Sequence, residues 1–182
     1  KMIIFQIAFF CSFSLFAQIN QDSSIAKNGN TRSVTDKPNF ILIVADDLGF
    51  ADLSFNGSNQ IRTPNIDKLA YTGVRFSEGY VSSPVCSPSR AGLLTGINQV
   101  KFGHDNNIEG NQPGFVPQYL WLPLSQETIA DKLKPLGYTS GLIGKWHLGD
   151  ESQFHPLKRG FYEFWGYTGG GHDYFTSSSD GK

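Results

Sequence analysis

The chain has 182 residues and a formal net charge of −1, with 15 Lys and Arg against 16 Asp and Glu. This balance argues against a basic surface for nucleic acid or anionic lipid, so we expect no nucleic-acid partner. Hydrophobic residues make up 39% of the chain and aromatic residues 14%, which is typical of a globular protein and not of a disordered one.

The first 17 residues have the pattern of a secretory signal peptide. Lys1 supplies one positive charge, an apolar run follows, and Ala17 is a small residue suited to cleavage. A retained membrane anchor is the alternative, but the run is short of the about 20 apolar residues that a span needs. We therefore predict a signal peptide at residues 1–17. The mature protein would be periplasmic or secreted, with no stable membrane insertion after cleavage. Residues 18–37 are polar and predict a flexible linker.

Residues 40–45 form an unbroken apolar run rich in β-branched side chains, which predicts a buried, parallel, central strand. The run ends at Asp46 and Asp47. Sites in open α/β sheets form beyond the carboxyl ends of strands, and two adjacent carboxylates there suit a hard divalent cation. A solvated Asp-Asp turn is the alternative.

Residues 63–73 predict a helix with clear signals at both ends. Thr63 is placed to act as the N-cap, Pro64 as the first helical residue and Gly73 as the stop. Residues 74–77 then predict a short strand.

A second helix is predicted from about Ser87 to Gly96, directly after Cys86. The chain has two cysteines, and the other one lies in the predicted leader. A lone thiol in an exported protein favours a modified active-site residue, with a buried structural cysteine as the alternative. Arg90 lies four residues after Cys86, so the two side chains share one helical face.

Residues 98–123 are rich in Gly, Asn, Gln and Pro and predict a long loop near the site, with His104 expected on the surface. Residues 126–134 predict a third helix, capped by Ser125 and ended before Pro135.

Residues 138–144 predict a strand, and strands that alternate with helices predict an α/β fold with a parallel sheet. Lys145 and His147 follow this strand at its carboxyl end, where a charge and a titrating imidazole can serve catalysis. His172 follows three glycines, which is typical of a loop that lines a substrate pocket.

Three segments together resemble the type I sulfatases, a formylglycine-dependent family of the alkaline-phosphatase-like superfamily. Residues 84–96 carry the Cys-x-Pro-x-Arg signature, residues 137–149 are similar to a second signature, and residues 38–49 are similar to the family's first metal-binding segment. The resemblance implies a three-layer α/β/α sandwich with a mostly parallel central sheet. Residues 38–182 would be the N-terminal part of the catalytic domain, so the fold would be incomplete in this fragment and the fragment inactive alone.

The resemblance also implies the chemistry. Cys86 would be converted to Cα-formylglycine by a formylglycine-generating maturation enzyme, and its hydrated aldehyde would attack sulfur. The expected cation is Ca²⁺, with Mg²⁺ as the alternative. The implied site residues are catalytic Cys86, Arg90, Lys145 and His147, substrate-binding Lys145 and His172, and metal-binding Asp46, Asp47 and Cys86.

We therefore predict a sulfuric ester hydrolase that acts on sulfated polysaccharides or aryl sulfates. Two alternatives stay open: a phosphonate monoester or phosphodiester hydrolase of the same superfamily, and a non-catalytic, carbohydrate-binding relative of the sulfatases.

Overall fold

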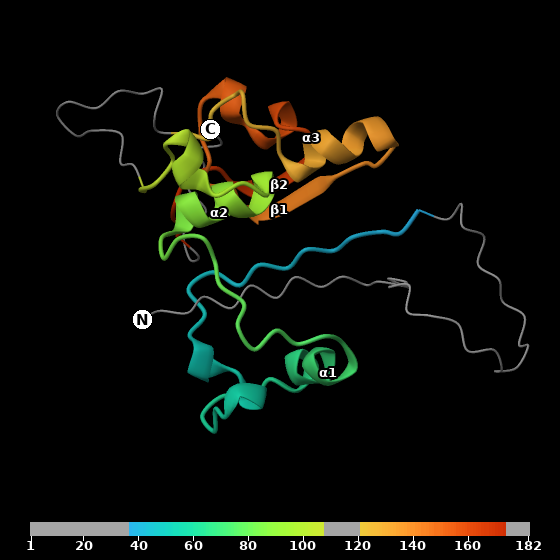
Figure 1. Cartoon of the computed structure of the whole chain (residues 1–182), viewed down its shortest axis with the longest axis vertical. Coiled ribbons are helices and arrows are strands. Elements are labelled where there is room, and N and C mark those ends of the chain that lie inside the picture. The colour runs from blue at the N-terminus through green and yellow to red at the C-terminus, as the bar shows by residue number, and fades with distance from the viewer. Residues whose placement is uncertain (1–36, 108–120, 174–182) are drawn as a thin grey trace, which may run out of the picture.

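The computed structural model describes residues 37–107 and 121–173 (Figure 1). The predicted signal peptide, most of the predicted linker and part of the loop at 98–123 lie outside the described residues. Among the described residues, no helix has the length and apolar character needed to cross a membrane. The helices and strands are α1 (Pro64–Thr72), α2 (Cys86–Thr95), α3 (Ile129–Leu133), β1 (Gly141–Lys145) and β2 (Glu163–Tyr167). Short 3₁₀ turns lie at Phe50–Asp52, Ser54–Asn56, Gln99–Phe102, Lys134–Leu136, Ser152–Phe154 and Pro156–Lys158.

Strands β1 and β2 pair in parallel, which confirms the expected α/β class with a parallel sheet. Leu142 and Phe164 are register partners, and both pack against the core. The next pair, Ile143 and Trp165, points to the opposite face and is 86% and 82% exposed. This alternation gives the described sheet one covered face and one open face.

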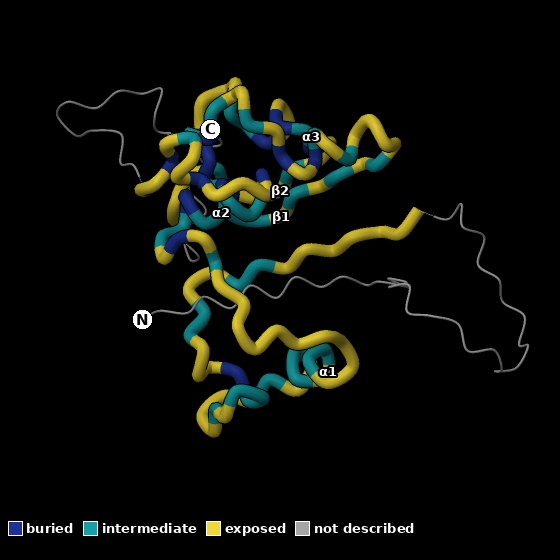
Figure 2. Tube along the Cα trace, in the orientation of Figure 1, coloured by how far each residue is buried: buried dark blue, intermediate teal, exposed yellow. Residues whose placement is uncertain are grey.

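The core lies on the covered face, between the sheet and helices α2 and α3 (Figure 2). Its largest member is Trp146, whose ring meets that of Phe161 edge to face, with centroids 5.9 Å apart. Small residues, Ala91 of α2 and Ala130 of α3, let both helices approach these rings closely. Trp146 and Phe161 thus add two large aromatic rings to this core.

Helix α2 begins at Cys86, one residue before the predicted start at about Ser87, and ends where Gly96 adopts a left-handed conformation (φ 68°). Helix α3 is shorter than predicted, because its N-cap is Thr128 and not Ser125. Thr128 Oγ1 accepts from Asp131 N at 3.2 Å, and Asp131 Oδ2 accepts from Thr128 N at 2.9 Å. This reciprocal capping box starts the helix one turn later.

Arg159 fixes the chain that leads into α3. Its guanidinium is buried and donates to three backbone carbonyls, those of Leu122, Pro123 and Gln126. Burying a carbonyl without a hydrogen-bond donor costs free energy. Here one side chain supplies the donors for all three carbonyls.

Helix α1 confirms its predicted limits, with Thr63 as N-cap and Gly73 at its C-terminus. Thr63 Oγ1 donates to Asp67 Oδ1 at 2.8 Å and accepts from Ser54 N at 2.9 Å, which ties the helix to the preceding turn. The strand predicted at 74–77 is wrong, because this segment is exposed and has no ladder partner among the described residues.

The prediction of a buried strand at 40–45 is also wrong. The segment lies along β1 in Figure 1, but a cavity of about 580 Å³ separates the two, and Phe40 and Ile41 are 47% and 64% exposed. A strand needs a neighbour to accept its hydrogen bonds, and the described residues supply β1 with only β2. The segment still carries Asp46 and Asp47 to the carboxyl end of β1.

Candidate active site

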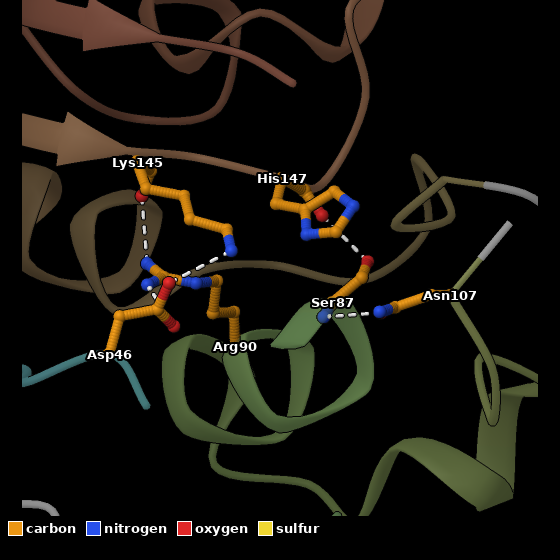
Figure 3. Close-up of polar contacts among 6 residues, drawn as sticks. All are labelled: Asp46, Ser87, Arg90, Asn107, Lys145 and His147. Carbon is orange, nitrogen blue, oxygen red and sulfur yellow. Dashed lines mark hydrogen bonds and ion pairs between the residues drawn. The ribbon is translucent and has the colours of Figure 1, made fainter. Parts of the chain in front are cut away.

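Six residues named from the sequence come together where β1 ends and α2 begins. Asp46 and Asp47 arrive from the first extended segment, Cys86 and Arg90 from α2, and Lys145 and His147 from the end of β1. Figure 3 shows four of these, Asp46, Arg90, Lys145 and His147, around the first turn of α2. The structure thus brings together segments that lie 44 and 55 residues apart in the chain.

Asp46, Asp47 and Cys86 could hold a metal ion. One carboxylate oxygen of each aspartate and the Cys86 sulfur all lie within 4.8 Å of one another. Asp47 adopts a left-handed backbone conformation (φ 55°), which is uncommon outside glycine and turns the chain sharply at this point. The two carboxylates suit a hard divalent cation, whereas a thiol does not, and an oxygen in place of the sulfur would complete a matching set.

Asp46 is held by two cations (Figure 3). Its Oδ2 lies 2.9 Å from Lys145 Nζ and its Oδ1 lies 3.2 Å from Arg90 Nη2. Burial alone would raise the pKa of this carboxyl, but the bonds and charges of Lys145 and Arg90 outweigh burial and lower the pKa. Asp46 is therefore a carboxylate at any physiological pH.

Lys145 and Arg90 hold two positive charges in fixed positions at the site. The Arg90 side chain is 14% exposed, and its Nη1 donates to the Lys145 carbonyl at 2.8 Å. Burial would lower the pKa of Lys145, yet Asp46 and Cys86 beside it raise the pKa, so the ammonium stays charged. Two held charges at one place can neutralise an anion without reorganising.

His147 has a strained backbone and an unusual proton affinity. Its φ is 56°, in the left-handed region. Burial, followed by the charges of Lys145 and Arg90, lowers the pKa of His147 to about 4. The neutral imidazole is therefore the favoured form of His147 near neutral pH, and its expected role in proton transfer stays a prediction.

His104 lies in the interior, so the prediction of a surface position is wrong. It is 1% exposed, and its Nε2 lies 2.7 Å from Ser87 Oγ. Burial lowers the pKa of His104, outweighing the Trp121 backbone and the charge of Asp105. Ser87 and His104 are the functional candidates that sequence reasoning missed, and only the position of Ser87 beside Cys86 could have pointed to them.

His172 lies beside the end of strand β2. It is exposed and stacks on Tyr167, with ring centroids 5.2 Å apart. The glycines before it approach the site instead: a Cβ at Gly170 would lie 2.7 Å from both Cε1 and Nε2 of His147. The glycine loop thus borders His147, while His172 lies at its outer end.

Comparisons with known proteins show which family this chain is similar to. N-acetylgalactosamine-6-sulfatase of Mus musculus is 42% identical over 131 residues, which are 71% of this chain and 25% of that protein. Arylsulfatase G of Homo sapiens is 41% identical over 155 residues, 85% of this chain and 28% of the relative.

Among solved structures, Ps i-CgsB in complex with k-i-k-neocarrahexaose aligns with a TM-score of 0.65 and 46% identity, over 71% of this chain and 28% of that one. The chain thus spans about a quarter of the length of the relatives it matches. The sequence model of the Sulfatase family matches residues 38–181. The chain belongs to the sulfatase family.

Proposed function

We propose that this chain carries the nucleophile, the first metal ligands and the sulfate-binding cations of a sulfuric ester hydrolase. The observation that carries this proposal is the convergence of Cys86 with two carboxylates, Asp46 and Asp47, within 4.8 Å. Lys145 and Arg90 stand at the same place, each bound to Asp46. A nucleophile, a cation site and fixed positive charge are the parts that attack on an anionic ester requires.

Residue 86 is the proposed nucleophile, in the form of Cα-formylglycine. This group supplies a hydrated aldehyde, whose two hydroxyls can attack sulfur and later release the product. Cys86 stands at the first position of α2, where the unpaired N–H groups and the dipole of a helix favour negative charge. The residue is half-buried, so substrate can reach it. A maturation enzyme that reads Pro88 and Arg90 is the proposed partner for the oxidation.

Asp46, Asp47 and residue 86 are the proposed ligands of a divalent cation, Ca²⁺ or Mg²⁺. Bound there, the cation supplies a Lewis acid that makes a neighbouring hydroxyl more acidic. The donor set supports an oxidised residue 86, because hard cations prefer oxygen to sulfur. Lys145 and Arg90 hold Asp46 in place meanwhile, through bonds of 2.9 and 3.2 Å.

The remaining side chains bind charge and handle protons. Lys145 and Arg90 present their positive charge to the sulfuryl oxygens. His147, neutral because its pKa is about 4, can accept a proton from a hydroxyl of residue 86 or from substrate. The glycine loop around Gly170 limits the space beside His147, and His172 at its outer end is a proposed substrate contact.

The proposed substrates are sulfated carbohydrates. The relatives support this class, since one is named N-acetylgalactosamine-6-sulfatase and one solved structure is a complex with k-i-k-neocarrahexaose. Aryl sulfates are the proposed model substrates, and a periplasmic or secreted location fits the predicted leader.

The test uses the full reading frame, expressed with a formylglycine-generating enzyme and supplied with Ca²⁺. We expect multiple turnover of 4-nitrophenyl sulfate, release of sulfate from sulfated galactans, and a mass at residue 86 that corresponds to the aldehyde. The matched control is the same protein made without the maturation enzyme. Faster cleavage of an aryl phosphonate or phosphodiester than of the sulfate would reject the sulfatase assignment. An unmodified Cys86 with tight sugar binding would favour a non-catalytic protein.

A further inference from the structure

Ser87 is the buried link between helix α2 and the candidate catalytic residue His147 (Figure 3). Ser87 is 2% exposed, and its Oγ donates to the His147 carbonyl at 2.6 Å. The two residues lie 60 positions apart in the chain. This bond therefore joins the helix that begins at Cys86 directly to the backbone of His147.

The backbone of His147 needs such a bond. A residue other than glycine is strained at φ 56°, and such backbone strain persists only where the surrounding structure holds it. On one side His147 N donates to the Thr168 carbonyl at 3.0 Å, and on the other its carbonyl accepts from Ser87. With both groups engaged, the backbone of His147 is held, and so is the direction in which its Cα–Cβ bond leaves the chain.

His104 completes the arrangement, and the proton count fixes its tautomer. Ser87 Oγ has one proton and gives it to the His147 carbonyl, so toward His104 Nε2, 2.7 Å away, it can only accept. The tautomer of His104 that fits these two bonds carries its proton on Nε2. The same loop holds the helix start, because Asn107 Oδ1 accepts from Ser87 N at 2.9 Å.

We propose that Ser87 and His104 are positioning residues that set the orientation of His147 relative to residue 86. The inference rests on the proposed function, in which His147 accepts a proton and residue 86 attacks sulfur. His104 orients the Ser87 hydroxyl, and the hydroxyl holds the strained turn. Neither residue needs to touch the substrate.

Activity of full-length variants tests this role. We expect Ser87→Ala and His104→Leu each to lower kcat about tenfold with KM within about twofold of wild type, because misdirected groups slow chemistry more than binding. The double variant should lose little more than either single one, because the two residues act through one bond. His104→Gln, which keeps an N–H near the Nε2 position, should recover most of kcat.

Gln99→Met is the matched control. Gln99 is equally buried, at 2% exposure, and its side-chain Nε2 donates to the Ser82 carbonyl at 3.1 Å, whereas its bond with His104 is made by its backbone carbonyl and is kept in the variant. We expect it to cost similar stability and to leave kcat within about twofold. Loss of kcat in the Ser87 and His104 variants no greater than in Gln99→Met would overturn the proposal.

A measurement on the wild-type protein keeps the inference testable if the variants do not fold. A neutron crystal structure should show deuterium on His104 Nε2 and the Ser87 hydroxyl directed at the His147 carbonyl. Deuterium on Nδ1 alone would refute the arrangement. Absence of sulfate ester turnover in the wild type, with this proton pattern intact, would reject the proposed function and leave the positioning geometry standing.

Discussion

Lys145 Nζ lies 2.9 Å from Asp46 Oδ2, although 99 residues separate the two along the chain. The carboxylate that we propose as a metal ligand is therefore also the counter-ion of a proposed sulfate-binding group. Charge at this one residue controls both the cation and the ammonium.

Replacing Asp46 should consequently weaken cation binding strongly. We expect Asp46→Asn to reduce Ca²⁺ affinity at least about tenfold, since one negative charge is lost from a site with hard oxygen ligands. Calorimetric titration of the full-length protein measures this. The control is Asp52→Asn, an exposed carboxylate of the same segment that accepts from Gly49 N at 3.0 Å. Equal Ca²⁺ affinity in both variants would mean that Asp46 belongs to a solvated surface turn and is not a metal ligand.

The nucleophile assignment makes the largest prediction. We expect Cys86→Ala to lower kcat for an aryl sulfate at least about a thousandfold, because no other group in the cluster can replace the attacking oxygen. The fold should be retained, as judged by circular dichroism and thermal unfolding, since Cys86 is only half-buried. Activity within about tenfold of wild type would correspond to only about 1.4 kcal/mol of barrier and would exclude residue 86 as nucleophile.

The glycine loop offers a paired test of the space around His147. A Cβ at Gly170 would meet the imidazole at 2.7 Å, whereas a Cβ at Gly171 would meet nothing within 4 Å. We expect Gly170→Ala to displace the ring and to lower kcat about tenfold, and Gly171→Ala to leave it unchanged. Steady-state kinetics of the two variants decide the matter, and similar values for both would show that the loop does not confine His147.

The low pKa of His147 predicts how stability depends on pH. Between pH 6.5 and about 4 the unfolded chain binds a proton at His147, whereas the folded protein does not. Stability should therefore fall as the pH is lowered through this range, by about 2 kcal/mol once partial exposure is allowed for. His147→Asn tolerates the left-handed backbone but cannot titrate, so urea unfolding should show a shallower acid dependence than wild type. Parallel curves would mean that His147 is solvated.

Arg159 should be important for stability and not for chemistry. Arg159→Met would leave the carbonyls of Leu122, Pro123 and Gln126 without their donor, which we expect to cost about 3 kcal/mol in urea unfolding. Its exposed neighbour is the control, and Lys158→Met should change stability by less than about 0.5 kcal/mol. Equal losses in the two variants would show that the three bonds contribute nothing net.

The sequence predicted which side chains converge better than it predicted the sheet. Asp46, Cys86 and Lys145 could be singled out because each belongs to a segment that resembles a signature of the family. Strand β2 could not be found, because two of its five residues are Glu163 and Gly166, and its extended form depends on the register with β1. Likewise, residues 40–45 have the composition of a buried strand, but composition does not determine whether a partner strand is present.

His104 was misplaced for a related reason. A histidine in a glycine-rich and asparagine-rich segment predicts a solvated loop, and only the folded chain brings the Ser87 hydroxyl to its ring. The helices were more predictable, since the limits of α1 and α2 depend on local residues such as Thr63 and Gly96.

The burial of Pro88 places the proposed oxidation of Cys86 in time. Pro88 is fully enclosed, and the Arg90 guanidinium is bound to Asp46 and to the Lys145 carbonyl. An enzyme that reads these two side chains, as proposed above, would not reach them in the folded protein. The proposed maturation would therefore act on a nascent or unfolded chain, before α2 packs.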